Sequence, residues 1–392
     1  MRTLILSFLL FSNALFGVEL ESLINTALQK SPSLEVINAR LTANKQSIDI
    51  ADQFANPEVA LVKNTLDSSQ AMSKTVLSVK QNIPYYSKRA KREGVALAED
   101  AVLKEKLRAA EAKLVERIKT EAYTIWELRE LTKIIDEYIS LTKRNITLYE
   151  SYTSIGASGH MGIMKAELSL SDLQVQKVAL EAKIYAAYAR LSALAAFRVE
   201  KLDIDLNITK KPALTSFENG LRYNPQIALR TKEIEKQNAK VALADVNNYP
   251  DVNVLAGYNY REKYDDYFSV GVGLSLPIYG TEDAKEERER ALLLAKRSQK
   301  EDTELGVNAA LKSYYAVMLS SYKIYHIIQD DALPQVAHMF ELSSSSISVG
   351  SDLFKYIDVL FQKLDLEKKS ILAIANYNKA EAKIAELQGK LQ

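Results

Sequence analysis

Residues that carry most protein chemistry are sparse in this chain. It has no cysteine and only three histidines, His160, His326 and His338. None of the three has a second metal ligand or a nucleophile at useful spacing. His160 and His338 each precede a methionine, and histidine with methionine suits soft cations such as copper or silver. We nevertheless expect surface or helix-packing positions for them, and we expect no metal site, no cofactor and no enzymatic activity.

Composition narrows the class of protein further. The 392 residues have a formal net charge of +1, which gives no reason to expect a nucleic-acid partner. Without cysteine there is no disulfide framework and no lipid-accepting residue after a signal peptide. Glycine (13) and proline (8) are few, which favours long uninterrupted helices.

The stretch from Val252 to Pro277 alternates with a period of two, which predicts two β-strands over residues 251–260 and 267–276. Each strand has one apolar face and one polar or small face. About ten residues is the length at which a tilted strand crosses a bilayer core. Aromatic residues gather towards the strand ends, as in the girdles of membrane barrels: Tyr258, Tyr260, Tyr264, Tyr267, Phe268 and Tyr279.

An internal repeat bears on how this hairpin is interpreted. Taken alone, the hairpin is better explained as the cover of a soluble core. Six of the eight prolines, however, form three pairs at a constant offset of 193 residues: Pro32 with Pro225, Pro57 with Pro250, and Pro84 with Pro277. The offset predicts a second, less regular strand pair at about residues 57–66 and 74–83. We interpret the chain as a tandem duplication, because the period is too long for a small solenoid unit.

Helical spacing fills most of the remaining sequence. Apolar residues three and four apart predict long helices at about residues 87–153, 162–197, 282–343 and 352–388. The first would be roughly 100 Å long, too long for an ordinary globular core, so we expect coiled-coil packing. Pro334 should remove a hydrogen bond and bend the third helix.

The predicted organisation has four parts, which are a signal peptide over 1–17, a first repeat over 18–197, a connector over 198–215 and a second repeat over 216–392. Residues 1–17 combine Arg2 with an apolar run and small residues, which is typical of a secretory signal. No later stretch has 18 continuous apolar residues, so no transmembrane helix is expected.

Over its whole mature length the chain resembles the TolC family of bacterial outer-membrane efflux channels. Each of the two tandem units has short helices, a strand hairpin, a long helix, a turn near a glycine and a returning helix. Local sequence matches occur ahead of each unit and near the second helix tip: Ala27-Leu28 with Ser31-Pro32, Gly220-Leu221 with Asn224-Pro225, and Leu333-Pro334 followed by Val349-Gly350 and Asp358-Val359-Leu360.

The resemblance implies a mainly α fold with transmembrane β-structure. It implies a homotrimer with a shared 12-stranded β-barrel in outer-membrane lipid and a periplasmic α-helical barrel. Four strands are too few to close a barrel, which agrees with a trimer. The implied function is a passive efflux conduit, joined to an inner-membrane pump of the RND or ABC type through a periplasmic adaptor, or membrane fusion protein.

Several alternatives for cargo and class stay open. Asn56-Pro57-Glu58, and Gln81-Asn82-Ile83-Pro84 with Lys88-Arg89, resemble the branch of the family that serves heavy-metal cation pumps. Multidrug pumps and a type I protein secretion system are the alternative assignments. A periplasmic adaptor, or a structural coiled-coil protein without channel activity, is the alternative class.

Candidate site residues lie near the two expected helix tips. A trimer would triple Glu167 and Asp358 into a six-carboxylate constriction that favours cations, with Lys165 and Lys355 clamping a closed periplasmic gate. A solvated helix face is the simpler alternative for these charges. For tip turns and adaptor docking the candidates are Ile155, Gly156, Gly159, Ile163, Val349, Gly350, Leu353 and Phe354, with packing inside one chain as the alternative.

Overall fold

The computed structural model describes residues 18–67, 70, 72–151, 157–347 and 353–391. The expected signal peptide lies outside this described part. The chain divides into two units: unit 1 is Met1–Leu34, Ala110–Asn224 and Asn308–Gln392, and unit 2 is Glu35–Ala109 and Pro225–Val307.

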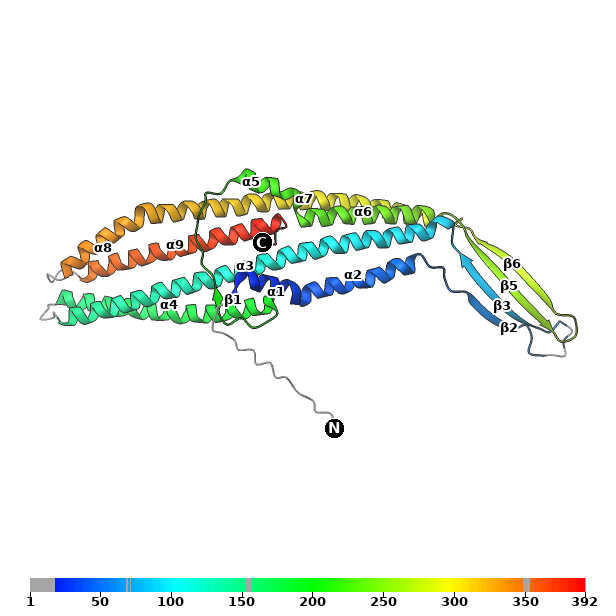
Figure 1. The fold of residues 1–392 in the computed structure, drawn as a ribbon, viewed down its shortest axis with the longest axis horizontal. Coiled ribbons are helices and arrows are strands. Elements are labelled where there is room, and N and C mark those ends of the chain that lie inside the picture. The colour runs from blue at the N-terminus through cyan, green and yellow to red at the C-terminus, as the bar shows by residue number, and fades with distance from the viewer. Residues whose placement is uncertain (1–17, 68–69, 71, 152–156, 348–352, 392) are drawn as a thin grey trace, which may run out of the picture. The chain divides into compact units, whose positions relative to one another are not determined.

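Helices make up most of both units (Figure 1). Glycine and proline are absent from Val95 to the end of the longest helix, so nothing interrupts its hydrogen-bond ladder. Among the described residues, no helix is long and apolar enough to cross a membrane. The helices are α1 (Leu20–Lys30), α2 (Pro32–Ala51), α3 (Tyr86–Ser151), α4 (Ala157–Ala195), α5 (Leu214–Glu218), the 3-10 helix η1 (Asn219–Tyr223), α6 (Pro225–Val246), α7 (Thr281–His326), the π-helical turn η2 (Ile327–Ala332), α8 (Leu333–Ile347) and α9 (Leu353–Leu387).

Both hairpins belong to one antiparallel sheet in unit 2 (Figure 1). The strands are β2 (Glu58–Lys63), β3 (Lys74–Ile83), β5 (Asp251–Arg261) and β6 (Tyr267–Ser275), in the order β2-β3-β5-β6. The hairpins join through β3 and β5, where Leu77 lies opposite Tyr258. In unit 1, β1 (Val18–Glu19) pairs in parallel with β4 (Leu202–Asp203).

Several element boundaries in the structure differ from the approximate ones expected. β2 ends at Lys63 and not at residue 66, because Asn64 turns the chain: its Nδ2 donates to the Met72 carbonyl at 2.8 Å and its Oδ1 accepts from the Lys74 amide at 2.7 Å. α4 begins at Ala157, so Gly159 lies in its first turn and not in the preceding loop.

The third long helix also differs from its expected form. Pro334 does not simply bend one α-helix, because the π turn η2 separates α7 from α8. α5 begins at Leu214, inside the expected connector.

Unit 1 has its core between α3, α4 and α9. Ile118 and Ile125 of α3 are fully buried, and so is Leu173 of α4. Trp126 of α3 packs in a cluster with Ile371 of α9. Residues seven apart share one helix face, so the apolar spacing that predicts these helices also forms their contact surface.

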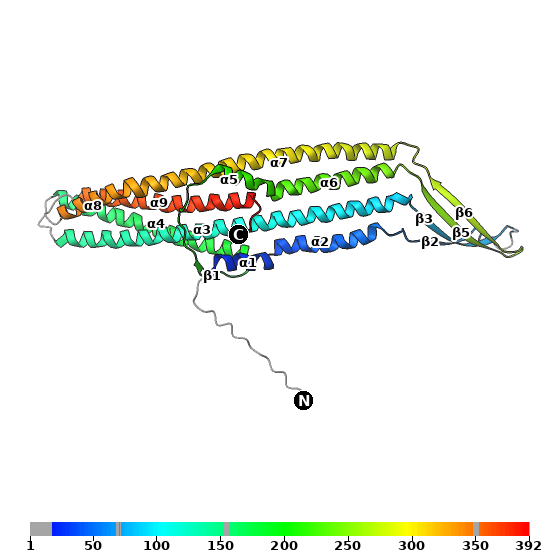
Figure 2. The same ribbon diagram turned by 45° about the horizontal axis from the view of Figure 1, so that its top comes forward.

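Unit 2 pairs α2 with the beginning of α3, and α6 with the beginning of α7 (Figure 2). Asn44 of α2 donates from Nδ2 to the Ala96 carbonyl at 3.0 Å, and Gln237 of α6 donates from Nε2 to the Glu289 carbonyl at 3.0 Å. Both amide side chains are buried. Each therefore has the partner that a buried polar group requires.

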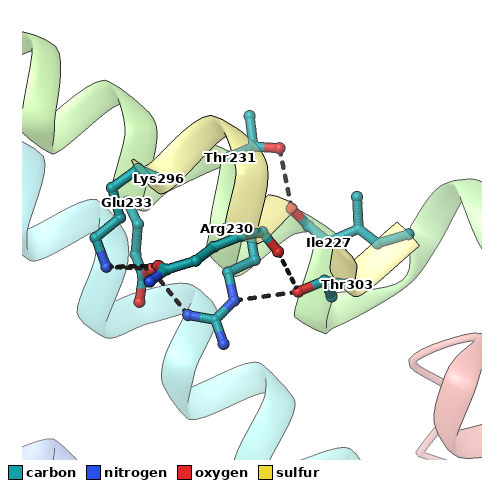
Figure 3. Close-up of polar contacts among 7 residues, drawn as sticks. Ile227, Arg230, Thr231, Glu233, Lys296 and Thr303 are labelled. Carbon is teal, nitrogen blue, oxygen red and sulfur yellow. Dashed lines mark hydrogen bonds and ion pairs between the residues drawn. The ribbon is translucent and has the colours of Figure 1, made fainter. Parts of the chain in front are cut away.

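Charged contacts reinforce the pairing of α6 with α7 (Figure 3). Oε2 of Glu233 accepts from Arg230 Nη1 at 3.0 Å and from Lys296 Nζ at 3.1 Å, while Arg230 Nε donates to Thr303 Oγ1 at 3.3 Å. Burial opposes ionisation of Glu233, but the hydrogen bonds from Lys296 and Arg230 outweigh it and hold the pKa of this carboxyl below its usual value. The carboxylate therefore stays charged at neutral pH and ties the two helices.

Candidate functional site

One face of the four-stranded sheet is apolar and exposed. The cross-strand register places Val254 opposite Val272 and Ala256 opposite Val270. Val270 and Val272 are 78% and 70% exposed. The other large apolar side chains exposed on this face are Val59, Leu61, Leu77, Val79, Ile83, Tyr258, Tyr260, Phe268 and Leu274. An apolar patch that crosses every strand indicates a surface that meets another protein or lipid.

The opposite face of the sheet is mostly small and polar, and its larger apolar residues are Val62, Val76 and Leu255. Asn259, which is 3% exposed, donates from Nδ2 to Ser269 Oγ at 3.0 Å. Gly257 lies beside this pair, and a Cβ built on it would stand 3.0 Å from Ser269 Oγ. Glycine at this position therefore leaves room for the hydrogen-bonded serine. The two faces differ as those of a strand between lipid and a water-filled lumen do.

Aromatic side chains stand at both ends of the sheet. At the turn end, Tyr258 packs on Phe268 with ring centroids 5.2 Å apart. At the helix end, Tyr85 stacks on Tyr249 at 4.6 Å and contacts Tyr86 at 4.6 Å. Our sequence analysis identified the turn-end group and Tyr279 but missed these three tyrosines. The sequence feature that could have identified them is their position next to Pro84 and Pro250, the prolines that flank the strands.

A buried ion pair lies where the sheet meets α3, and sequence reasoning missed it as well. Lys88 Nζ is 2.8 Å from Asp251 Oδ1 and 2.7 Å from the Tyr249 carbonyl. The Tyr85 amide also donates to Asp251 Oδ1, at 2.8 Å. The Lys88 side chain is 6% exposed. The first turn of α3 is therefore joined to the first residue of β5 through a charge with little access to water.

In unit 1, two of the four candidate gate residues meet. Lys165 Nζ of α4 is 2.5 Å from Asp358 Oδ1 of α9. These positions are 193 residues apart, the offset of the repeat. Glu167 and Lys355 are exposed and form no ion pair in the described part of the chain. The structure of one chain therefore brings together one acid and one base of the four candidates.

Much of the expected tip lies outside the described residues, namely Ile155, Gly156, Val349 and Gly350. Ile163 is half-buried on α4, and Leu353 and Phe354 open α9. His326 Nδ1 lies 3.0 Å from Asp330 Oδ2, and His338 is exposed on α8. Over the residues that are described, no group of three histidine or acidic side chains could hold a metal ion.

Comparison with known proteins identifies the fold. No model of a known protein family matches the chain, and no curated protein matches it in sequence. Solved structures match it over nearly its whole length, and they are outer-membrane channels, so the TolC-like fold expected for one chain is confirmed.

Three of these structures illustrate the match. The open state of the Neisseria gonorrhoeae MtrE outer membrane channel has a TM-score of 0.81 at 13% identity, covering 95% of this chain and 89% of that one. The Campylobacter jejuni CmeC outer membrane channel has a TM-score of 0.78 at 12% identity, with coverages of 94% and 85%. The Vibrio cholerae outer membrane protein VceC has a TM-score of 0.78 at 15% identity, with coverages of 95% and 96%.

Proposed function

We propose that this chain is a subunit of a TolC-family outer-membrane efflux channel, a passive conduit across the outer membrane and periplasm. Residues 1–17 would direct its export. The observation that carries the proposal is the sheet with one exposed apolar face, one polar face and aromatic side chains at both ends. Such a surface is expected where lipid lies on one side and an aqueous lumen on the other.

The sheet edges support a homotrimer. Within the described residues, the outer strands β2 and β6 pair on one side only. Unpaired backbone groups are costly in lipid, and four strands are too few to enclose a lumen. Three copies joined edge to edge, β6 of one to β2 of the next, would satisfy these groups in a barrel of 12 strands.

Exposed stripes on the helices of unit 1 support the same assembly. On α4 the exposed apolar residues follow a spacing of threes, fours and sevens: Met161, Met164, Leu168, Val175, Val178 and Tyr185. On α7, η2 and α8 a second exposed set comprises Val317, Ile324, Ile327, Met339 and Leu342. A spacing that averages 3.5 forms a coiled-coil seam. A second and third copy of this chain would cover these seams.

The remaining partners and the cargo are proposed from the resemblance alone. They are a periplasmic adaptor and an inner-membrane pump of the RND or ABC type. Heavy-metal cations are the proposed cargo. Lys88 is part of the sequence pattern that suggests this cargo, but its ion pair with Asp251 gives it a structural role as well.

The mass of the protein extracted from outer membranes in mild detergent tests the proposal. We expect three copies of a chain of 43.9 kDa, less the signal peptide, after correction for bound detergent. A stable monomer or dimer would leave the sheet edges unpaired and would contradict the channel. It would favour an adaptor or a structural coiled-coil protein instead.

The charges at the helix end give a prediction about gating. Replacing Asp358 and Glu167 together with alanine should raise leak conductance in planar bilayers, because it removes the partner of Lys165 and the second acid of the proposed ring. An exposed ion pair contributes about 0.5 kcal/mol, so three copies acting together would change the open-to-closed ratio about tenfold.

D365A is the matched control for this experiment. Asp365 is also an exposed acid of α9 and lies 2.6 Å from Lys369 Nζ on its own helix. Its removal should leave the conductance unchanged. Equal conductance of all three proteins would refute the gate and leave Asp358 as a surface charge.

A further inference from the structure

The sequence Asn-Ile-Thr occurs twice in the chain, at residues 145–147 and 207–209. Both copies fit the pattern Asn-x-Ser/Thr, with x other than proline, at which exported proteins accept N-linked glycans. Modification also requires that the asparagine amide and the hydroxyl two residues later be accessible together to an enzyme. The two copies differ in this respect in the folded chain.

The first copy lies in α3, where both groups are already engaged. Asn145 Nδ2 donates to the Tyr356 hydroxyl at 3.1 Å, and Thr147 Oγ1 donates to the Lys143 carbonyl at 3.2 Å. Ile146 between them is buried. Residues two apart on a helix do not face each other, so the amide and the hydroxyl lie on different sides of α3. This copy is therefore a poor acceptor.

The second copy lies in the connector between β4 and α5 (Figure 1). Residues 204–209 form neither helix nor strand, and their exposure alternates. The even-numbered residues are half-buried, and Ile204 and Leu206 pack against the cluster that contains Trp126. Alternate side chains of an extended segment lie on opposite sides of the backbone. The exposed side is formed by Asp205, Asn207 and Thr209.

Hydrogen bonds fix the backbone of this segment and leave the acceptor side chains accessible. The Asn207 carbonyl accepts from Asn378 Nδ2 of α9 at 3.3 Å, and the Lys210 carbonyl accepts from the Tyr377 hydroxyl of α9 at 2.7 Å. Within the described residues, the side chains of Asn207 and Thr209 make no hydrogen bond. A substituent on the Asn207 amide would therefore break no contact of the folded chain.

The residue two positions before each asparagine also separates the two copies. It is Asp205 before Asn207 and Lys143 before Asn145. The enzymes that transfer N-linked glycans in bacteria also select an acidic residue at this position, where a cationic group of the enzyme can pair with the carboxylate. Asp205 is exposed on the same side of the segment as Asn207.

We propose that Asn207 is a site of N-linked glycosylation. The donor class is an oligosaccharide carried on a polyprenyl diphosphate, and an oligosaccharyltransferase catalyses the transfer. Asn207 Nδ2 forms a bond to C1 of the first sugar while the bond between C1 and the diphosphate oxygen breaks. Polyprenyl diphosphate leaves with the electron pair, and one amide proton passes to a base of the enzyme. The inference rests on the export proposed for residues 1–17, and it does not require a channel.

Mass spectrometry of tryptic peptides from the protein purified from its native cells tests the site. Cleavage after Lys201 and Lys210 releases peptide 202–210, and cleavage after Arg144 and Lys165 releases peptide 145–165. We expect peptide 202–210 to be heavier than its sequence by the mass of an oligosaccharide. Peptide 145–165 should have the mass of its sequence.

Four variants and a matched control assign the modification to Asn207. N207Q and T209A should each abolish the added mass, because the first removes the acceptor and the second the hydroxyl. T209S retains the hydroxyl and should retain the added mass. D205A removes one charge-assisted hydrogen bond to the enzyme and should lower the modified fraction about tenfold. N145Q, the same change in the other copy, should leave the added mass unchanged.

Three results would overturn the site: a peptide 202–210 without added mass in a parent protein that has lost its signal peptide, an added mass that N207Q retains, or an equal effect of N145Q. If N207Q does not accumulate, T209A and T209S decide, because equal modification of these two variants also contradicts the proposal. A retained signal peptide would contradict the export itself. The extracted mass of the assembly tests the trimer separately.

Discussion

V272R should prevent stable insertion of this protein into the outer membrane. Val272 lies on the exposed apolar face of β6, opposite Val254 and near the middle of the strand. An arginine at the bilayer midplane of a membrane strand destabilises the folded protein by about 2–4 kcal/mol. In an assembly of three copies this cost applies to each copy. The amount of folded assembly that detergent extracts from outer-membrane preparations should fall to a small fraction of the parent amount.

L255R is the matched control for this prediction. Leu255 lies on β5 between Val254 and Ala256, at nearly the same height as Val272, but its side chain belongs to the other face of the sheet. If that face lines an aqueous lumen, an added arginine there keeps its hydration and the variant should assemble. Normal assembly of V272R, or loss of L255R alone, would show that the apolar face does not meet lipid.

K88M should strongly destabilise the junction between α3 and the sheet. The substitution leaves Asp251 with the Tyr85 amide but without its compensating charge. Removing one partner of a buried ion pair costs about 3–5 kcal/mol, and we expect the lower end because the Asp251 side chain retains 23% exposure. The urea midpoint of the detergent-solubilised protein should fall accordingly.

Two further variants separate charge from packing at this junction. K80M breaks the pair between Lys80 and Glu58, whose side chains are 45% and 74% exposed, and should cost less than about 1 kcal/mol. Adding D251N to K88M removes the uncompensated charge and should recover much of the loss. Equal urea midpoints for K88M and K80M would show that the buried pair contributes no more to stability than the exposed pair.

The contacts of the candidate gate residues could be described only with both the sequence and the structure. The sequence pointed to Glu167 and Asp358 near the helix tips, with Lys165 and Lys355 as their partners, and the structure joins only Lys165 with Asp358. Side-chain pairing across two helices depends on how the helices are rotated about their axes. Spacing along one helix carries no information about that rotation.

Local patterns in the sequence were enough to locate most helices and strands of this protein. Alternation with a period of two located the strands, apolar spacing of threes and fours located the long helices, and prolines at a constant offset located the repeat. These patterns are local, because each depends on which side of a strand or helix a residue occupies. The same alternation identified the apolar face of the sheet before the strand order was known.

The contacts between residues far apart in the sequence are known from the folded chain alone. The tertiary structure joined the hairpins through β3 and β5, paired Lys88 with Asp251 across 163 residues, and converted the expected bend at Pro334 into a π turn. Strand order and ion pairing depend on contacts between segments that no local period relates. The π turn depends on a balance between a missing amide at Pro334 and the packing of Ile328, and that packing exists only in the folded helices.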